Sequence, residues 1–567
     1  PMTSLNPVLT VGEQIMELIM LHLKYDKQQA RRRALELLAM VGIPDGEERL
    51  GYYPVQFSGG MRQRVMIAMA MASDPKILIA DEATTALDVT TQEQILDLLR
   101  DIVRKTKTAL IIITHNLSVV ARYADRIYVM YAGNVVERAS TEELFQNPSH
   151  PYTQGLLNAI PRLDGDKNEK LVAIDGMPLN PAKKDGHCPF HARCRYAQKV
   201  CLEQGIPPMR ELSPTHGTAC WLEIPYAGKP KEKEGSALLN KKLGQEILSV
   251  EHIKKFYPVY KGVLRKKVAD VKALDDVSFT VKAGETVGLV GESGCGKTTL
   301  AKSILRMHEI TEGKIVFDGQ DITHLRERAL RPLRKDIQFI FQDPYGSLDP
   351  RQTAGSIVGE VLKTNRLVHS KKEYQDKIAE LFQAVGVDPA LQDRMPHEFS
   401  GGQRQRIGIA RALASNPKLI ICDEPISALD VSIQAQIINL LIKLQKEYGL
   451  TYLFIAHDLS VVRHISDRIV VMYLGKVMEV SPWEELYANP LHPYTQALLS
   501  AIPIPDPEVE RKRAHVPLKG EVPSLLNRPS GCVFHNRCPY QTERCRREVP
   551  SLDERSPGHL AACFHTQ

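Results

Sequence analysis

The sequence predicts an α/β protein that contains two tandem copies of one module, each followed by a small cysteine-rich extension. Short apolar runs that end in polar residues alternate with helix-like stretches, as in parallel sheets covered by helices. A set of motifs occurs twice, and Phe57 and Phe399 begin the same four-residue string 342 positions apart. One glycine-rich loop stands between an apolar strand and a helix-like segment.

The composition is typical of a globular protein of more than one domain. The 567 residues carry 73 basic and 67 acidic side chains, and this mild net charge of +6 does not indicate a nucleic-acid partner. Apolar runs such as Ala109–Ile113 and Leu419–Cys422 are far shorter than the roughly 18 residues of a membrane span, and we interpret both as buried parallel strands. We therefore expect a cytoplasmic protein whose membrane role depends on partner proteins.

The internal repeat defines the expected domains. Copy one comprises residues 1–160 and a cysteine-rich extension at 161–225, and a linker at 226–245 follows. Copy two comprises residues 246–500 and an extension at 501–567. Pro1 aligns with Pro344 of copy two, so we expect copy one to lack its N-terminal part with the phosphate loop.

The loop of copy two matches G-x-x-x-x-G-K-[ST] between the strand Glu285–Val290 and a helix-like segment. Glycines allow successive backbone N–H groups to face phosphates, and the helix N-terminus adds positive potential. Lysine contacts the β- and γ-phosphates, and the threonine hydroxyl binds Mg²⁺. The expected nucleotide-binding residues here are Gly291, Glu292, Ser293, Gly294, Cys295, Gly296, Lys297, Thr298 and Thr299.

A second set of polar residues follows apolar strands of the same copy. Asp423 and Glu424 end the run from Leu419, and we expect Asp423 to hold Mg²⁺ and Glu424 to act as general base. His457 ends another strand and is expected to contact the γ-phosphate, and Gln342 is expected beside the nucleotide and Mg²⁺. Taken alone, two acids at a strand end are more often solvated, and a single histidine is more often structural.

The decisive motif is Ser400, Gly401, Gly402 and Gln403, which precedes a helix-like segment. Small residues at a helix N-terminus form a second phosphate nest. With this motif the chain resembles the ATP-binding-cassette (ABC) ATPases, so the predicted fold is two tandem P-loop ABC nucleotide-binding domains. The resemblance implies that each nest contacts ATP bound by the other cassette. Ser58, Gly59 and Gly60 of copy one are thus expected to complete the site around Lys297.

Copy one departs from the family pattern at two positions. Met61 replaces the signature glutamine, and Ala83 stands where copy two has Pro425. Met61 leaves the Ser-Gly-Gly donors intact, so we expect nucleotide binding to survive.

Segments after each cassette narrow the resemblance. The strings around His150-Pro151-Tyr152 and His492-Pro493-Tyr494 are similar to those of the oligopeptide and dipeptide importer branch, which includes nickel and glutathione systems. The resemblance implies an ATPase at the cytoplasmic face of the membrane that uses ATP and Mg²⁺. The implied partners are two permease subunits and, indirectly, an extracellular solute-binding protein.

Eight of the ten cysteines form two matching quartets. Their spacing is wider than the C-x2–4-C pairs of most structural zinc sites, and disulfides are not expected in a reducing compartment. Four loop-borne thiolates suit an iron–sulfur cluster, and the resemblance implies two [4Fe–4S] clusters, with zinc as the alternative. The expected ligands are Cys188, Cys194, Cys201 and Cys220 in the first extension and Cys532, Cys538, Cys545 and Cys563 in the second.

Three other classes of cassette protein are alternatives to an importer ATPase. A ribosome-binding cassette ATPase has a long charged helical linker, and a DNA-repair cassette protein carries its cysteines within the cassettes. Here the linker is short and the cysteines follow the cassettes. A non-catalytic regulator is expected to lose Lys297 or Glu424, and both are present.

Overall fold

The computed structural model divides the chain into two compact units. Unit 1 comprises residues 1–127 and 505–512, and unit 2 comprises residues 128–504 and 513–567. The structure describes residues 4–84, 87–163, 165, 167, 170–177, 179, 186–226, 243–261, 266–513, 516, 518, 520 and 522–565. Most of the expected linker at 226–245 lies outside these residues, so the predicted domain limits stay predictions.

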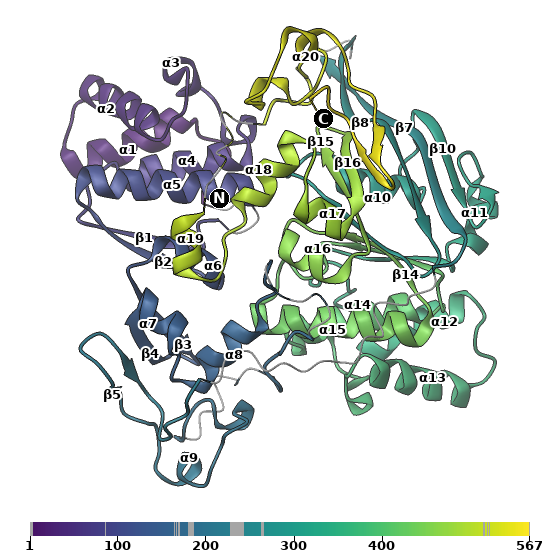
Figure 1. Ribbon diagram of the computed structural model, residues 1–567, viewed down its shortest axis with the longest axis horizontal. Helices are drawn as coiled ribbons and strands as arrows, with labels where there is room; N and C mark the ends of the chain where they lie inside the picture. Colours follow the sequence, from purple (N-terminus) through teal and green to yellow (C-terminus); the bar gives the residue numbers. More distant parts are fainter. Residues whose placement is uncertain are drawn as a thin grey trace. The chain divides into compact units, whose positions relative to one another are not determined.

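Unit 1 is mainly helical around a small parallel sheet (Figure 1). Strands β1 (Ile77–Asp81) and β2 (Ala109–Ile113) pair in parallel. A buried apolar cluster joins them to α1, α2, α4 and α5. The helices are α1 (Val11–Leu23), α2 (Lys27–Met40), α3 (Gly46–Arg49), α4 (Gly59–Ala70), α5 (Val89–Thr106), α6 (Leu117–Tyr123) and α19 (Pro507–Lys512).

The prediction that Ala109–Ile113 is a buried strand is half wrong. The segment is a parallel strand, but Ile111 and Ile113 are 49% and 48% exposed. The reason is the extent of the sheet, because among the described residues β2 pairs only with β1 and helices cover one face. The equivalent strand of copy two, Thr451–Ile455, lies between two neighbouring strands and is fully buried. The strand beside it contains Leu419–Cys422 and is also fully buried, as the sequence predicts.

In unit 2 the second cassette is built on an eight-stranded sheet with the order β12-β13-β14-β9-β15-β16-β18-β17. The first five strands are parallel and the others pair antiparallel. The strand that leads into the phosphate loop, β9, is therefore an inner strand of the parallel part, between β14 and β15. The bounds are β9 (Thr286–Val290), β12 (Ile337–Ile340), β13 (Leu419–Asp423), β14 (Thr451–Ile455), β15 (Arg468–Tyr473), β16 (Lys476–Pro482), β17 (Asp553–Ser556) and β18 (His559–Ala561).

A second sheet of this cassette has the order β11-β10-β7-β8 and lies beside the first (Figure 1). Apolar side chains of the two sheets and of α10 share one core. The strands are β7 (Glu246–Lys261), β8 (Lys266–Lys282), β10 (Glu312–Phe317) and β11 (Gln320–Asp321). The helices are α10 (Lys297–Ile304), α11 (Glu327–Leu333), α12 (Ala354–Thr364), α13 (Lys371–Ala384), α14 (Gly401–Leu413), α15 (Val431–Tyr448), α16 (Leu459–Ile465), α17 (Trp483–Ala488) and α18 (Pro493–Ala501).

Each cysteine-rich extension adds a short hairpin to a cassette sheet. In copy two, β18 pairs with β16, and α20 (Glu543–Arg547) precedes the hairpin. The corresponding strands of copy one form a sheet of order β3-β4-β6-β5. The strands are β3 (Arg126–Tyr131), β4 (Asn134–Ser140), β5 (Arg210–Glu211) and β6 (Gly217–Thr218). The helices of this part of the chain are α7 (Thr141–Gln146), α8 (Pro151–Ala159) and α9 (Val200–Glu203).

A buried glutamate on the cassette strand fastens each extension. The Glu479 carboxylate accepts backbone N–H groups of Leu491 and His492 at 2.8 and 3.0 Å, and it lies 2.7 Å from His559 Nε2. Glu137 makes the same three contacts in copy one. The strand, the His-Pro-Tyr segment and the terminal hairpin therefore form one structural unit in each copy.

None of the helices in the described part of the chain is both long enough and apolar enough to cross a membrane.

Candidate nucleotide site of the second cassette

The phosphate loop connects β9 to α10 in a conformation that its glycines make possible. Gly291 and Gly296 have φ angles of +151° and +107°, which side chains rarely tolerate. A Cβ atom on Gly291 would lie 2.1 Å from the backbone oxygen of Met472, and one on Gly296 would lie 2.6 Å from that of Ala273. Both positions therefore require glycine for conformation and for space.

Lys297 is buried at the start of α10 and turns back over the loop. Its Nζ donates to the backbone oxygens of Gly291 and Glu292 at 2.7 and 3.1 Å. These contacts keep the ammonium group at the concave side of the loop. A phosphate placed there would meet a fixed positive charge together with the N-terminal end of the helix.

Thr298 and Asp423, both predicted to hold Mg²⁺, lie in contact. Thr298 Oγ1 donates to Asp423 Oδ1 at 3.2 Å. Burial raises the pKa of Asp423 above its ordinary value, and the hydrogen bond from Thr298 offsets part of that effect. Hydroxyl and carboxylate oxygens are ligands that Mg²⁺ prefers, so this pair fits the ion.

Glu424, Gln342 and His457 also converge. Gln342 Nε2 donates to Glu424 Oε2 at 2.7 Å, and His457 Nδ1 lies 3.6 Å from the same oxygen. Burial is the largest influence on the pKa of Glu424 and raises it, but His457, Lys297 and Gln342 together lower it more, so its pKa lies below the ordinary value. Glu424 also has a φ of +46°, an uncommon conformation that recurs at functional sites. A carboxylate held ionised in this position suits a general base.

The signature motif caps α14. Ser400 Oγ accepts the backbone N–H of Gln403, and the Gln403 side chain accepts the backbone N–H of Ser400. In unit 1, Ser58 likewise caps α4 by accepting from Met61, but methionine offers no amide for the reciprocal bond. The departure at Met61 thus removes half of a capping box and leaves the serine and glycines in place.

The first cassette repeats part of the catalytic group. Glu82 has a φ of +44°, and its Oε1 lies 3.0 Å from His115 Nδ1. The Glu82 side chain is 46% exposed, whereas that of Glu424 is 19% exposed. Within the part of unit 1 that the structure describes, no phosphate loop adjoins Glu82. The predicted joining of Ser58, Gly59 and Gly60 with Lys297 involves residues of two units and stays a prediction.

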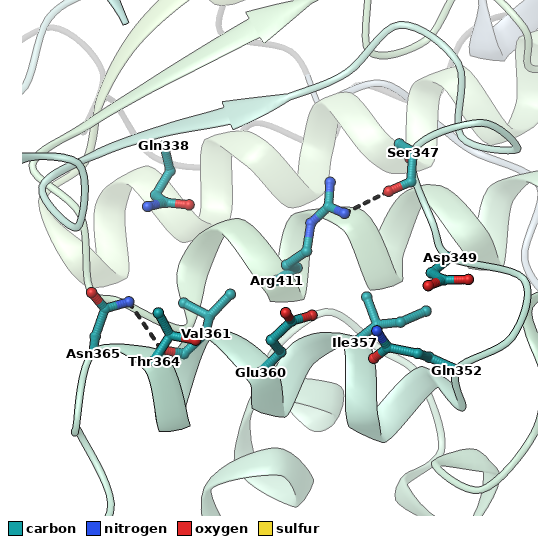
Figure 2. Close-up of a pocket in the computed structure, with 10 residues that line it drawn as sticks. All are labelled: Gln338, Ser347, Asp349, Gln352, Ile357, Glu360, Val361, Thr364, Asn365 and Arg411. Carbon is teal, nitrogen blue, oxygen red and sulfur yellow. Dashed lines mark hydrogen bonds between the residues drawn. The ribbon is translucent and has the colours of Figure 1, made fainter. Parts of the chain in front are cut away.

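A cavity of about 470 Å³ lies beside the segment that follows Gln342 (Figure 2). Arg411 Nη1 donates to the backbone oxygen of Ser347 at 2.6 Å and so fixes this wall. Figure 2 shows Arg411 above the α12 side chains, with Glu360 between Ile357 and Val361. The lining residues are Gln338, Ser347, Asp349, Gln352, Ile357, Glu360, Val361, Thr364, Asn365 and Arg411.

The cysteine quartets are made of free cysteines. Burial raises the pKa of Cys194 and of Cys538 to about 11, and neighbouring thiols of the same quartet contribute to the rise. Cys532 and Cys545 also share a backbone hydrogen bond, as do Cys188 and Cys201. Yet the described residues contain no group of three or more His, Cys, Asp or Glu side chains placed to hold a metal ion. The described residues therefore do not show the predicted clusters, which stay a proposal.

Two family models match the chain, each in both copies. The "ABC transporter" model matches residues 2–85 and 274–427, which include the phosphate loop and both signature motifs. The "Oligopeptide/dipeptide transporter, C-terminal region" model matches residues 136–201 and 478–545. The glutathione import ATP-binding protein GsiA of Pectobacterium atrosepticum is 46% identical over 529 residues, which cover 93% of this chain and 77% of the relative.

The chain belongs to the ABC transporter ATP-binding proteins. As an ABC ATPase it carries two cassette segments of mixed α/β fold. The oligopeptide transport ATP-binding protein OppD of Mycobacterium tuberculosis is 46% identical over 89% of this chain and 84% of its own length. GsiA of Escherichia coli K12 is 44% identical over 93% of this chain and 77% of its own length.

Two residues of this ABC ATPase that contact the phosphate loop were missed by sequence reasoning. Tyr494 was noted only as part of a branch motif, and Arg537 was not singled out. Both contact Glu292, which lies more than 200 positions earlier. The repeat was the available signal, because Tyr152 and Arg193 occupy the equivalent positions in copy one.

Proposed function

We propose that this ABC ATPase energises the uptake of oligopeptides or dipeptides across a membrane. The observation that carries the proposal is the match of the oligopeptide/dipeptide C-terminal region to both copies, in the segments around His150 and His492. The names of the relatives give it support, since one is an oligopeptide transport protein and another a glutathione import protein. Import of glutathione, itself a small peptide, or of nickel is the alternative within this branch.

The proposed chemistry is hydrolysis of ATP at the second cassette. Lys297 and the loop N–H groups hold the phosphates, and Thr298, Asp423 and the Gln342 amide oxygen are the proposed Mg²⁺ ligands. Mg²⁺ neutralises charge on the phosphates when bound. Glu424 accepts a proton from the attacking water, and His457 keeps that carboxylate ionised.

The proposed permease site is the cavity beside Ser347. Ser347, in the wall of this cavity, comes five residues after Gln342, and Gln342 contacts Glu424. A protein bound in the cavity could therefore act on Glu424 through the segment that contains Gln342. The lining has the half-buried cation Arg411 and the carboxylates Asp349 and Glu360, which offer both signs of charge to a cytoplasmic loop. The counterpart predicted at Pro1–Leu5 lies partly outside the described residues.

Cysteine crosslinking tests the docking. We expect Ser347→Cys to crosslink to a cytoplasmic permease loop in a transport-active complex. Glu312→Cys, an exposed position on β10, is the matched control and should not crosslink. Failure of Ser347→Cys in an active complex would refute docking at this cavity.

The cargo is tested with the chain, its permeases and its solute-binding protein reconstituted in vesicles. Uptake of labelled di- and oligopeptides that depends on ATP and is lost in Lys297→Ala supports the proposal. Uptake of glutathione or nickel in place of these peptides would show that the alternative cargo is the correct one.

The cysteine quartets form a separate part of the proposal, namely two [4Fe–4S] clusters. The mutual influence of the thiols on their pKa values supports a shared site, although the placement of the side chains does not favour one. Protein purified without oxygen should contain iron and absorb near roughly 400 nm. Stoichiometric zinc without iron would assign the quartets to zinc.

A further inference from the structure

Arg537 of the C-terminal extension contacts the phosphate loop directly. Its Nη1 and Nη2 donate to Glu292 Oε2 and Oε1 at 2.6 and 3.1 Å, a bidentate ion pair. The two side chains are 3% and 1% exposed. Glu292 is the second residue of the loop, whereas Arg537 lies in a short 3₁₀ helix at His535–Arg537, immediately before Cys538.

The His-Pro-Tyr segment holds the same loop residue by its backbone. Tyr494 Oη accepts the backbone N–H of Glu292 at 2.9 Å. The rings of Tyr494, Tyr473 and Phe534 pack with centroids 4.7 to 5.3 Å apart, and the Arg537 guanidinium lies 5.8 Å from the centroid of Tyr473. Side chain and backbone of Glu292 are thus both held by residues that lie more than 200 positions later in the chain.

We propose that Arg537 is a positioning residue for nucleotide binding, through which the C-terminal extension sets the affinity of the phosphate loop. The proposal rests on the assignment of the nucleotide site to Lys297 and its loop. A glycine-rich loop is costly to order, and a ligand binds more tightly when part of that order exists beforehand. The bidentate pair and the Tyr494 hydrogen bond supply this order next to Gly291.

Copy one provides an internal comparison. Arg193 lies in the position equivalent to Arg537, 5.9 Å from the ring centroid of Tyr131. Its Nε donates to the backbone oxygen of Asp175 at 3.0 Å, and its Nη2 to that of Ile174 at 3.4 Å. Arg193 also lies 3.5 Å from Ser432 Oγ, but among the described residues it makes no contact to a phosphate loop. It shares with Arg537 the place beside a tyrosine ring, which makes it the matched control.

The test is calorimetric titration of the full chain with Mg-ADP, which is not hydrolysed. We expect Arg537→Gln to weaken binding about tenfold, because it removes the bidentate guanidinium partner of the buried Glu292 carboxylate. Arg193→Gln should change the affinity less than twofold. The double variant Arg537→Gln with Glu292→Gln should recover most of the loss, since no uncompensated charge remains in the loop.

The possible outcomes test the inference and the nucleotide site separately. Unchanged affinity in Arg537→Gln, while Lys297→Ala abolishes binding, would overturn this inference and leave the nucleotide site intact. Normal binding by Lys297→Ala would instead refute the site itself. If Arg537→Gln does not fold, Glu292→Gln alone is titrated. A loss of Mg-ADP affinity in Glu292→Gln, with an apo melting temperature equal to that of the wild type, supports the positioning role. Unchanged affinity in Glu292→Gln overturns it. A double variant that folds without recovery would also overturn it.

Discussion

Thr298 Oγ1 donates a hydrogen bond to Asp423 Oδ1, with 3.2 Å between the two oxygens. The pair joins the first turn of α10 to the end of β13, two elements 125 residues apart in the chain. Asp423 is buried, and burial raises its pKa. The protein without a cation therefore keeps an unfavourable charge at this point, which bound Mg²⁺ would neutralise.

Replacing Asp423 by Asn should separate stability from binding. Above the raised pKa the ionised carboxylate costs folding free energy, so Asp423→Asn should equal or exceed the wild type in apo melting temperature at neutral pH. This gain should vanish at a pH below the ordinary pKa of aspartate, where both proteins are neutral at this position. The rise in melting temperature on adding Mg-ATP should be lost. Calorimetric scans with and without Mg-ATP measure both effects.

Replacing His457 by Ala should move the acid limb of the pH–rate profile to higher pH. Contact with His457 is one of the influences that lower the pKa of Glu424 against the effect of burial, so removal of the imidazole should raise that pKa. A general base with a higher pKa is protonated at higher pH, and kcat falls there first. The profile of kcat for ATP hydrolysis measures the shift. His115→Ala, the equivalent change in copy one, is the control, and an unmoved acid limb in His457→Ala would contradict this role.

Much of the site was predictable because its chemistry fixes short local patterns. The phosphate loop needs glycines at set intervals before a helix, and the signature serine caps α14 in the position its sequence predicts. Asp423 is the last residue of a fully buried strand and Glu424 is the next residue, so both carboxylates are expected at the carboxyl end of the parallel sheet. Local sequence was sufficient for these residues.

Other features depend on tertiary structure and have no local pattern. The pairing of Arg537 with Glu292 spans 245 positions, and nothing near either residue specifies the other. The exposure of Ile111 and Ile113 also depends on sheet neighbours, since the same apolar pattern is buried in copy two. Periodicity predicts a strand but does not report how many strands flank it.

Replacing Glu479 by Gln should loosen the terminal hairpin. The carboxylate accepts two backbone N–H groups and contacts His559, and an amide has one acceptor oxygen. At least one buried donor would lose its partner, at a cost of about 1–3 kcal/mol. Hydrogen exchange of residues 553–561 should accelerate at least about fivefold.

Glu137→Gln is the matched variant, because Glu137 makes the same contacts with Ser149, His150 and His216. It should accelerate exchange in β5 and β6 and leave residues 553–561 unchanged. If Glu479→Gln leaves exchange in its own hairpin unaltered, the glutamate does not fasten the extension.

The last prediction concerns which carboxylate supports ATP hydrolysis. Glu424 follows Asp423, the residue that Thr298 contacts, and Gln342 and His457 both contact Glu424. Glu82 has the same backbone conformation and a histidine partner, but the described part of unit 1 brings no phosphate loop to it. A general base contributes only where nucleotide and water are positioned, because this reaction depends on positioning and charge stabilisation.

Glu424→Gln should therefore abolish phosphate release in this chain while Mg-ATP still binds, since the amide keeps the shape of the side chain but cannot accept a proton. Glu82→Gln should leave the rate nearly unchanged. Steady-state phosphate release at saturating Mg-ATP, with calorimetric titration to confirm binding, compares the two variants at equal folding. A large loss of activity in Glu82→Gln would mean that nucleotide is presented to the first cassette as well, and the assignment of hydrolysis to Glu424 alone would then be wrong.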